Sequence, residues 1–338
     1  MNRRAPTIID VAKAAGVSIA TVSRTLNDGL VSARTRDRVM DAVQRLGYRQ
    51  NSLARGLVTG RSGVIGVLIP DVVGPLYAHM ARGIEETLAP LGMHYMMVTD
   101  NRDIDQERAA IELLLGRRVD ALVIIGSRLP PDALMSLVPQ AVPYVLVQRE
   151  SGGEPGRPTI ALDNDHAVRR VMDHLFRHGH RRIAHLSGTR RDGAERLASY
   201  QRVMAAQGLE PRVLDARATE EGGVEAGAKV AADDAISAVF CSNDRVAIGL
   251  YHALKTRGRR VPNDVSVVGF DDLPWSRYLD PPLTTIHQPG HEMGRRAAEI
   301  VVAQLHDADV HHDDVLIAPT LIERSSVAHV LEGGDAIR

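Results

Sequence analysis

Few residues that could perform catalysis or bind a metal stand at the spacing that such chemistry requires. His174 and His178 are four positions apart and could share one helix face, but no carboxylate completes a metal site there. We interpret them as part of a helix end near Gly179. Residues 311–314, His-His-Asp-Asp, are typical of a solvated loop. Cys241, the only cysteine, excludes an internal disulfide and is expected to be buried and inert.

The motifs of the large enzyme classes are missing from the sequence. There is no G-x-x-x-x-G-K-[ST] phosphate loop, no G-x-G-x-x-G after a strand-like run and no G-x-S-x-G nucleophile elbow. Gly222, Gly223 and Gly227 resemble a glycine loop only loosely and fit the start of a helix better. We therefore expect no catalytic residue, no metal and no cofactor, and the sequence does not indicate an enzyme.

Charge is segregated along the chain. Residues 1–62 hold eleven Lys and Arg against four Asp and Glu, a net charge of +7. The remainder holds thirty against thirty-eight, a net charge of −8, so the total is −1. A basic head on an acidic body suggests that the head contacts a polyanion. The alternative is a charged tail without a partner.

Length and composition describe an ordinary globular protein. The 338 residues are enough for two or three domains, with 44% hydrophobic and 25% charged residues. No apolar run approaches the ~18 residues of a membrane span, and no basic-then-apolar leader opens the chain. We therefore expect a cytoplasmic protein without a membrane partner.

The head has the start and stop signals of three short helices. Thr7 can cap a first helix that Gly16 ends, and Ser18 can cap a second helix that runs through Leu26. Ser32 can cap a third, which Gly47 ends. Three helices with a Gly-Val-Ser turn predict a helix-turn-helix domain of about fifty residues.

From Val64 the pattern changes to apolar strand-like runs that alternate with amphipathic stretches. Residues 51–57 before it form a short helix-capable link, and residues 59–63 a flexible joint. The alternating segments are 64–69, 76–91, 93–98, 104–116, 120–125, 132–138, 143–147, 165–178, 182–186, 194–207, 236–241, 244–257 and 265–270. Buried strands separated by helices predict a doubly wound α/β class with parallel sheets. More than 200 residues of this pattern suggest two subdomains.

One segment in the head carries a specific motif. Residues 10–27, DVAKAAGVSIATVSRTLN, resemble the DNA-binding signature of the LacI/GalR (lactose and galactose repressor) family, D-V-A-x-x-A-G-V-S-x-x-T-V-S-R-x-L-N. The thirteen agreeing positions are Asp10, Val11, Ala12, Ala15, Gly16, Val17, Ser18, Thr21, Val22, Ser23, Arg24, Leu26 and Asn27. Glycine at position 16 also suits a tight turn between two helices.

The resemblance implies which side chains read the DNA. Ile19, Ala20 and Arg24 would face base edges in the major groove, and of these only Arg24 has a donor fork suited to guanine. Its alternative role is a phosphate contact. The remaining head residues implied as phosphate-positioning or capping groups are Ser18, Thr21, Ser23 and Asn27.

The link after the head resembles the family's hinge helix, which folds on operator DNA. The hinge residues implied in DNA binding are Asn51, Ala54, Arg55 and Leu57. Leu57 matches the leucine that the family wedges into the minor groove. Gly56 within so short a helix costs about 1 kcal/mol relative to alanine, so the helix should form only when DNA and the partner hinge pack on it.

Later landmarks extend the resemblance over nearly the whole chain; they lie at residues 71–77, 268–272, 283–286 and 321–326. They imply a periplasmic-binding-protein-like core of two doubly wound parallel-sheet subdomains, with chain crossings near Leu162, Ile286 and Pro319. The implied divisions are 1–50 for the DNA-binding domain, 51–62 for the hinge and linker, and 63–338 for the effector-binding and dimerisation core. Within the core, the N-subdomain would comprise 63–161 and 287–318, and the C-subdomain 162–286 and 319–330.

The family's effector pocket maps onto nine positions of this chain. Tyr77 matches a stacking aromatic, Arg196 a ligand-clamping arginine, and Asp271 a group that binds hydroxyls. An ion pair between Arg196 and Asp271 across the cleft is the alternative for those two. The full implied set is Leu76, Tyr77, Gln148, Arg190, Asp192, Arg196, Thr219, Asn243 and Asp271, of which Arg190, Asp192 and Thr219 are the looser candidates.

Three positions depart from the family pattern. Leu76 stands where an aromatic is usual, Gln148 where an aspartate is common, and Gln50 where a proline usually precedes the hinge. With Arg149, Arg190 and Arg196 nearby by this mapping, the pocket could favour an anionic sugar. A neutral sugar is an equal alternative, and a purine or nucleoside is a weaker one.

The function implied by the resemblance is a ligand-responsive, sequence-specific transcriptional regulator. Members of this family are most often repressors, and repression of a carbohydrate-metabolism operon is the role expected here. Its partners would be pseudo-palindromic double-stranded DNA, a sugar-like effector and a second copy of the chain, with a tetramer left open. A solute-binding protein and an α/β enzyme of sugar metabolism are the alternatives. The basic head argues against the first, and the missing catalytic motifs argue against the second.

Overall fold

The computed structural model describes residues 6–26, 29–48, 61–149, 157–188, 191–307 and 310–330, with the side chains of Arg191 and Asp192 excepted. The chain divides into two compact units, Met1–Ser62 and Gly63–Arg338. Within the described residues, no helix is long and apolar enough to cross a membrane.

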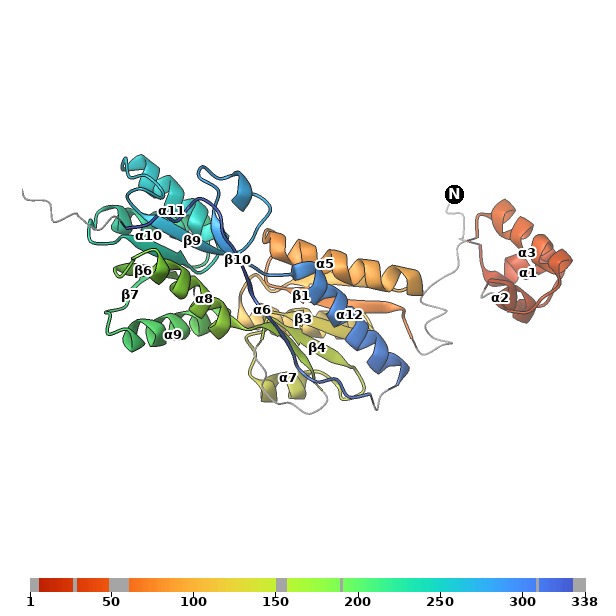
Figure 1. The fold of residues 1–338 in the computed structure, drawn as a ribbon. Helices are drawn as coiled ribbons and strands as arrows, with labels where there is room; N and C mark the ends of the chain where they lie inside the picture. The colour runs from red at the N-terminus through yellow and green to blue at the C-terminus, as the bar shows by residue number, and fades with distance from the viewer. Residues whose placement is uncertain are drawn as a thin grey trace, which may run out of the picture. The chain divides into compact units, whose positions relative to one another are not determined.

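The head consists of α1 (Ile8–Ala15), α2 (Ile19–Leu26) and α3 (Ala33–Leu46), which confirms the three predicted helices (Figure 1). Thr7 caps α1 through a reciprocal pair of hydrogen bonds. Its hydroxyl accepts from the Asp10 backbone N–H at 3.4 Å, and its own N–H donates to the Asp10 carboxylate at 2.8 Å. The first helix therefore begins where the sequence signals it.

Six small apolar side chains from all three helices form the core of the head: Val11, Ala12, Ala15, Val22, Val39 and Ala42. Gly16 makes the tight turn between α1 and α2 with a φ of +61°, a conformation that favours glycine. A Cβ at this position would also lie 2.7 Å from Nη2 of Arg38. The backbone angle therefore favours glycine there, and a side chain would also displace the end of the Arg38 side chain.

The body contains two six-stranded sheets. The first has the strand order β11-β5-β4-β3-β1-β2, and all of its neighbouring strands are parallel. Its members are β1 (Val64–Ile69), β2 (His94–Thr99), β3 (Ala121–Ile125), β4 (Tyr144–Val147), β5 (Thr159–Leu162) and β11 (Val315–Ile317).

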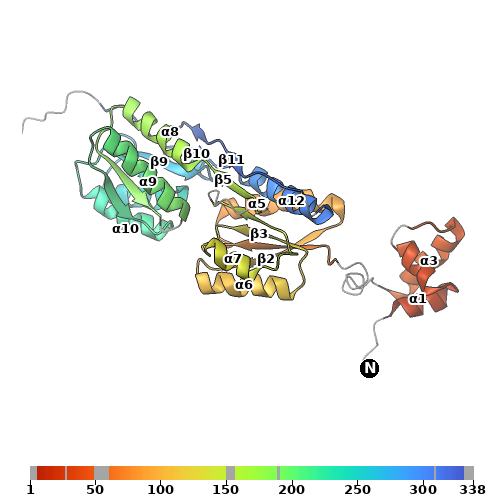
Figure 2. The same cartoon turned by 90° about the horizontal axis from the view of Figure 1, so that it is seen from below.

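Helices cover both faces of this first sheet. Figure 2 shows α5 (Pro75–Leu88) beside α12 (Gly290–His306) on one face, and α6 (Ile104–Gly116) with α7 (Pro131–Leu137) on the other. Successive strand residues point to opposite faces, so Val67 packs in the α5–α12 cluster and Leu68 in the α6–α7 cluster. Burial on both sides explains why these strands read as continuous apolar runs.

The second sheet has the order β12-β10-β9-β8-β6-β7. Its strands are β6 (Ile183–Ser187), β7 (Arg212–Asp215), β8 (Ala238–Cys241), β9 (Ser266–Asp271), β10 (Thr284–His287) and β12 (Thr320–Ile322), which pairs antiparallel with β10. Helices α8 (Asn164–Arg177) and α9 (Arg191–Ala206) pack on one face. Helices α10 (Glu220–Ala231) and α11 (Asp244–Thr256) pack on the other. The predicted doubly wound α/β class is confirmed.

The chain passes between the two sheets three times. It leaves the first sheet after β5 and returns after β10 to form α12 and β11, and then it crosses once more into β12. In open α/β sheets, ligands bind beyond the carboxyl ends of the strands. The loops that follow β1, β2 and β4 of one sheet and β6, β8 and β9 of the other therefore define where a site should lie.

Candidate functional site

The second helix of the head presents one exposed face. Val22 and Thr25 point inward and are buried, whereas Ala20 and Arg24 are exposed and the side chain of Ile19 is 47% exposed. Because the core holds the opposite face, the exposed residues are those that can meet another molecule. They include all three side chains that the family resemblance implies as readers of base edges.

Ser18 caps this helix as its residue type suggests. Its hydroxyl accepts a hydrogen bond from the Thr21 backbone N–H at 3.1 Å and lies 2.9 Å from the Thr21 hydroxyl. Ser23 is half-buried on the same helix. The implied DNA-binding residues Asn27, Asn51, Ala54, Arg55 and Leu57 lie outside the described residues.

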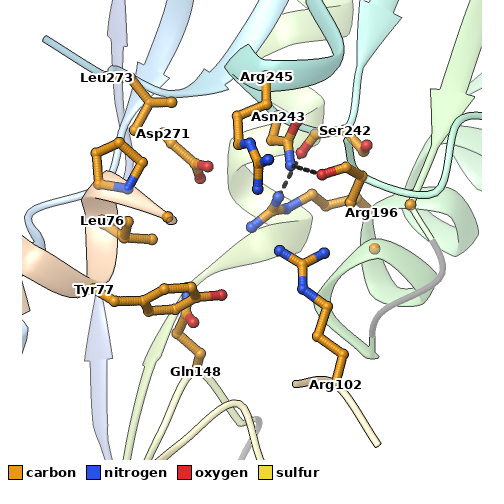
Figure 3. A pocket seen from close by; sticks show the side chains of 15 residues that line it. Leu76, Tyr77, Arg102, Gln148, Arg196, Ser242, Asn243, Arg245, Asp271 and Leu273 are labelled. Atoms are coloured by element: carbon orange, nitrogen blue, oxygen red, sulfur yellow. Dashed lines mark hydrogen bonds between the residues drawn. The ribbon is translucent and has the colours of Figure 1, made fainter. Parts of the chain in front are cut away.

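The body contains a pocket between its two sheets, lined by residues of both (Figure 3). Six of the nine implied effector residues line it: Leu76, Tyr77, Gln148, Arg196, Asn243 and Asp271. Five of them lie at the end of a strand or in the loop or first helical turn that follows one, and Arg196 lies in the second turn of α9. Arg190 and the side chain of Asp192 lie outside the described residues.

Thr219 does not line the pocket. It is the N-cap residue of α10, and its hydroxyl accepts from the Gly222 backbone N–H at 3.1 Å. The neighbouring Ala218 lines the pocket instead. A threonine directly before a glycine-containing helix start is itself a capping signal, and capping α10 is the role that Thr219 has in the structure.

Arg149 also lies elsewhere than the sequence mapping suggested. Its side chain is buried, and Nη1 donates to the Leu129 carbonyl at 3.0 Å, within the first subdomain. It is not part of the pocket lining. Two other arginines, Arg102 after β2 and Arg245 in the first turn of α11, do line the pocket and were not identified from the sequence.

Arg196 is a buried polar side chain of the pocket lining, at 3% exposure. Its Nε donates to the Asn164 side-chain oxygen at 2.9 Å, and Nη1 donates to the Ser242 carbonyl at 2.6 Å. The guanidinium also stacks on the Phe270 ring, 3.5 Å from its centre. These contacts hold the planar group in one orientation at the edge of the pocket.

The acceptor groups of the pocket are also held by their elements. Asn243 caps α11, with its side-chain oxygen accepting from the Val246 N–H at 2.9 Å. Asp271 ends β9 with a φ of +108°, and Asp272 follows at +53°. Such angles are unfavourable for residues other than glycine, at about 1–3 kcal/mol each, so the surroundings must impose them.

Asp244 provides part of that constraint. This fully buried carboxylate accepts hydrogen bonds from the Leu273 N–H at 2.8 Å and from the hydroxyls of Ser276 and Thr285 at 2.5 and 2.6 Å. Burial raises the pKa of Asp244 to about 6, although the hydrogen bonds from the two hydroxyls oppose the shift. It thereby ties the loop after Asp271 to α11 and β10.

Asp272 anchors the same loop on its other side. Its carboxylate accepts from Nη2 of Arg324 at 2.6 Å and lies 3.0 Å from Nδ1 of His287. Burial favours the neutral acid, but the hydrogen bonds from His287 and Arg324 outweigh it and lower the pKa of Asp272. His287 ends β10, where the chain crosses to the first subdomain, so the pocket loop is linked to a crossing segment.

Nothing in the pocket indicates a metal centre. Across the part of the chain that the structure describes, no group of three or more His, Cys, Asp or Glu side chains could hold a metal ion. Cys241 is buried, and burial raises the pKa of its thiol well above its usual value, which keeps the thiol protonated. The pocket is equipped for hydrogen bonding and stacking rather than for bond breaking.

Comparison with known families gives two matches. Residues 7–51 match the family of bacterial regulatory proteins of the lacI type, and residues 172–327 match the periplasmic binding protein-like domain. The HTH-type transcriptional regulator GalS of Salmonella typhimurium is 36% identical over 333 residues, which cover 95% of this chain and 96% of GalS.

Solved structures agree over the same length. The lac repressor dimer bound to operator and the anti-inducer ONPF superposes with a TM-score of 0.86 at 26% identity, covering 96% of this chain and all of that one. The complex of the transcriptional regulator CelR with cellobiose has a TM-score of 0.69 at 30% identity, covering 95% of this chain and 99% of that one.

A helix-turn-helix head joined to a two-subdomain, periplasmic-binding-protein-like core defines a class of ligand-responsive DNA-binding regulators, which are not enzymes. The chain belongs to the LacI family of transcriptional regulators. The family assignment from residues 10–27 is thus confirmed.

Proposed function

We propose that this protein represses a carbohydrate-metabolism operon and that a sugar or sugar derivative in the pocket of the core sets its affinity for the operator. The observation that carries the proposal is the pocket itself. It brings a stacking aromatic, a clamped guanidinium and a carboxylate from two subdomains together around one space, which suits a polyhydroxylated ligand. The transcriptional regulator CelR, which was solved with cellobiose, supports the carbohydrate class.

In this proposal residues 1–50 bind DNA, residues 51–62 form the hinge, and residues 63–338 bind the effector and the second subunit. Within the core, residues 63–161 with 287–318 and residues 162–286 with 319–330 are the two subdomains that close on the ligand. The chain acts as a dimer, with one head on each half-site of an inverted repeat. The lac repressor, solved as a dimer on its operator, supports this arrangement.

The proposed DNA contacts divide by role. Arg24 donates to a guanine edge, and Ile19 and Ala20 make apolar contacts with neighbouring bases. The groups that position the head on phosphates or cap its helices are Ser18, Thr21, Ser23 and Asn27. In the hinge, Asn51, Ala54, Arg55 and Leu57 contact the minor groove, with Leu57 as the wedge.

Substitution of Asp271 tests the effector site. Because Asp271 accepts hydrogen bonds from the ligand in this proposal, Asp271→Ala should abolish the response to the effector while operator binding without effector survives. If the effector releases DNA, the variant is permanently repressed; if the effector promotes binding, it is permanently derepressed. Arg196→Ala should behave in the same way, provided that its melting temperature shows an intact fold.

Asp173→Ala is the matched control, since Asp173 is exposed on α8 and does not line the pocket. Reporter-gene assays in cells and calorimetry on the purified proteins give the two readouts. Undiminished effector affinity in both Asp271→Ala and Arg196→Ala would place the effector site elsewhere.

A further inference from the structure

Three guanidinium groups line the same pocket. In Figure 3, those of Arg102, Arg196 and Arg245 gather on one side, whereas Asp271 lies across from them beside two leucines. Asp271 is the only carboxylate among the lining residues that the structure describes. The pocket therefore has a cationic side and a side with one carboxylate and an apolar surface.

Arg102 is fixed in place by an ion pair within its own subdomain. Its Nε donates to Oδ2 of Asp71 at 2.9 Å, and its Nη2 makes a second, shorter contact with the same oxygen. The other oxygen of Asp71 accepts from the Gly74 N–H at 2.7 Å. Burial favours the neutral acid, but the hydrogen bond and charge of Arg102 and the hydrogen bond from the Gly74 N–H together lower the pKa of Asp71. A charged carboxylate thus orients a charged guanidinium.

Arg245 is held in the same manner on the second subdomain. Its Nε donates to Oε1 of Glu220 at 2.8 Å, and its Nη2 lies 2.6 Å from Oε2, a two-point contact between α11 and α10. The side chain of Arg245 is only 14% exposed. Such bidentate pairing leaves the guanidinium little freedom to rotate.

Both ion pairs use the same edge of the arginine, formed by Nε and Nη2. In the part of the chain that the structure describes, Nη1 of Arg102 and Nη1 of Arg245 donate to no protein group. Neither Asp71 nor Glu220 lines the pocket, whereas both arginines do. A ligand in the pocket therefore meets the N–H donors of each arginine and not the carboxylate paired with it, although the formal charges of each ion pair cancel.

Helix ends add to the positive field. The first turn of α5 and the first turn of α11 both line the pocket, and helix N-termini favour negative charge. A neutral sugar would leave this donor-rich side poorly paired, because its hydroxyls accept weaker hydrogen bonds than an anionic oxygen does. The ligand groups that would pair with these donors are a carboxylate or a phosphate ester.

We propose that the effector is an anionic polyol, a sugar acid or a sugar phosphate, whose charged group is bound by Arg102 and Arg245 with Arg196 beside them. Asp271, across the pocket from the arginines, binds hydroxyls of the same ligand, and Asn243 binds a hydroxyl beside Arg245. The inference rests on the proposed function of this pocket and goes further by naming the ligand class. Arg102 and Arg245 come from different subdomains, so the anion would also draw the two together.

The test measures binding of matched ligands to the purified full-length protein by calorimetry. Each set contains a neutral sugar, its sugar acid and its 6-phosphate, for example glucose, gluconate, glucuronate and glucose 6-phosphate, and the corresponding galactose set. Adenosine and cytidine serve as neutral nucleosides. We expect at least one acid or phosphate to bind, and its neutral parent to bind at least about 10-fold more weakly. The acid and phosphate arms identify which anion is preferred.

Arg102→Gln and Arg245→Gln test the residues. Each should weaken binding of the anion by about 10- to 100-fold, because one charge-assisted hydrogen bond is lost, while any weak binding of the neutral parent stays the same. Arg212→Gln is the control, since Arg212 is also paired with an aspartate but lies outside the pocket. Melting temperatures establish that each variant is folded, and Arg102→Lys and Arg245→Lys should recover part of the affinity because they restore the positive charge.

Several outcomes would overturn the proposal. They are a neutral sugar or nucleoside that binds at least as tightly as every acid and phosphate, failure of all the acids and phosphates to bind, and unchanged anion affinity in both glutamine variants. The proposed function fails separately. If a neutral effector changes operator affinity, the protein is still a ligand-responsive regulator, and only the proposal of an anionic effector fails. If an anion binds without changing operator affinity, the proposed ligand class stands, and the proposed regulatory role fails.

Discussion

At the scale of single residues, Arg24 is the side chain on which sequence recognition should depend most. It is exposed on the face of α2 opposite Val22 and Thr25. If its two-pronged donor binds a guanine edge, Arg24→Ala should cost about 1–3 kcal/mol and relax the preference at one base pair in each half-site. A permutation scan of the operator bases by fluorescence anisotropy measures both effects.

Arg45→Ala is a suitable control for this experiment, because Arg45 is also exposed but lies in the last turn of α3. It should leave the base preferences unchanged. If Arg24→Ala instead lowers affinity evenly for all sequences, Arg24 contacts a phosphate and does not read a base.

A second residue-scale prediction concerns acid stability. His185 is fully buried on β6, where Nδ1 donates to the Phe240 carbonyl at 2.9 Å and Nε2 has no partner in the described structure. Burial lowers the pKa of His185 from 6.5 to about 4. The folded state therefore resists protonation, and stability that is complete above pH 6.5 is lost as the pH falls toward 4.

The variant His185→Phe removes this titration and keeps a ring beside Phe240. Between pH 7 and pH 4, the free energy of unfolding of the wild type should fall relative to the variant by on the order of 3 kcal/mol. Comparing the two proteins cancels contributions from other groups, such as Asp244, whose raised pKa acts in the opposite direction. Urea unfolding at a series of pH values provides the measurement, and parallel pH curves for the two proteins would contradict the prediction.

Sequence alone located only part of the site residues, for a physical reason. Leu76, Tyr77 and Asp271 were located because they lie in the landmark segments 71–77 and 268–272, and Gln148, Arg196 and Asn243 were located by mapping the family's pocket position by position. Arg102 lies in no motif, and its position depends on a turn after β2 with a φ of +62°. Arg245 was detectable, since it comes two residues after Asn243 at the start of a helix. Its partner Glu220 is on another helix, which no local pattern reveals.

At the scale of elements, the contact between α5 and α12 should be intolerant of added volume. A Cβ at Gly83 would lie 2.1 Å from the His291 carbonyl oxygen, and a Cβ at Gly294 would lie 2.0 Å from the Met80 carbonyl oxygen. Both obstacles are backbone atoms, so the helices themselves must move apart. Gly83→Ala should therefore destabilise the core by about 1–3 kcal/mol or more, as overpacking does. Thermal unfolding monitored by circular dichroism measures the effect.

Gly116→Ala offers the opposite expectation in the same subdomain. Gly116 is the last residue of α6, and a Cβ there would meet nothing within 4 Å. Since alanine is the better helix former, this variant should be as stable as the wild type or more stable, by up to about 1 kcal/mol. Equal melting temperatures for Gly83→Ala and Gly116→Ala would show that the close helix contact is not as the structure describes.

Most elements were predictable because their burial is visible in the sequence. Strands such as β1 and β3 are covered on both faces and appear as unbroken apolar runs. Two of the elements outside the predicted series, β7 and α10, lack that signal. Strand β7 is an edge strand whose residues are largely exposed, and α10 is rich in glycine and alanine because it packs closely against α11. In a helix such as α10, close contact with a neighbouring helix therefore determines the residue types more strongly than amphipathic periodicity does.

At the scale of the whole molecule, the separation of charge predicts that the head and the body have separate functions. Residues 1–62 carry +7 and residues 63–338 carry −8. If the head supplies the phosphate contacts, operator affinity should fall by roughly 10³-fold or more between 50 and 200 mM salt. A truncated chain that begins at Gly63 should remain folded and bind effector, since it is a compact unit of its own, and should not bind DNA. Retardation of operator DNA by the truncated chain would refute the assignment of the head.

The central claim is that a ligand in the pocket of the core sets the affinity of the head for DNA. Selection from random duplexes should first yield an inverted repeat, and calorimetry the ligand. Fluorescence anisotropy of full-length protein on that repeat then gives the operator Kd with and without saturating ligand. Allosteric coupling of about 1–3 kcal/mol predicts a change of about 5- to 150-fold in the wild type. In Asp271→Ala the change should be absent, with the ligand-free Kd unaltered. An operator Kd that is the same with and without ligand in the wild type would contradict the account.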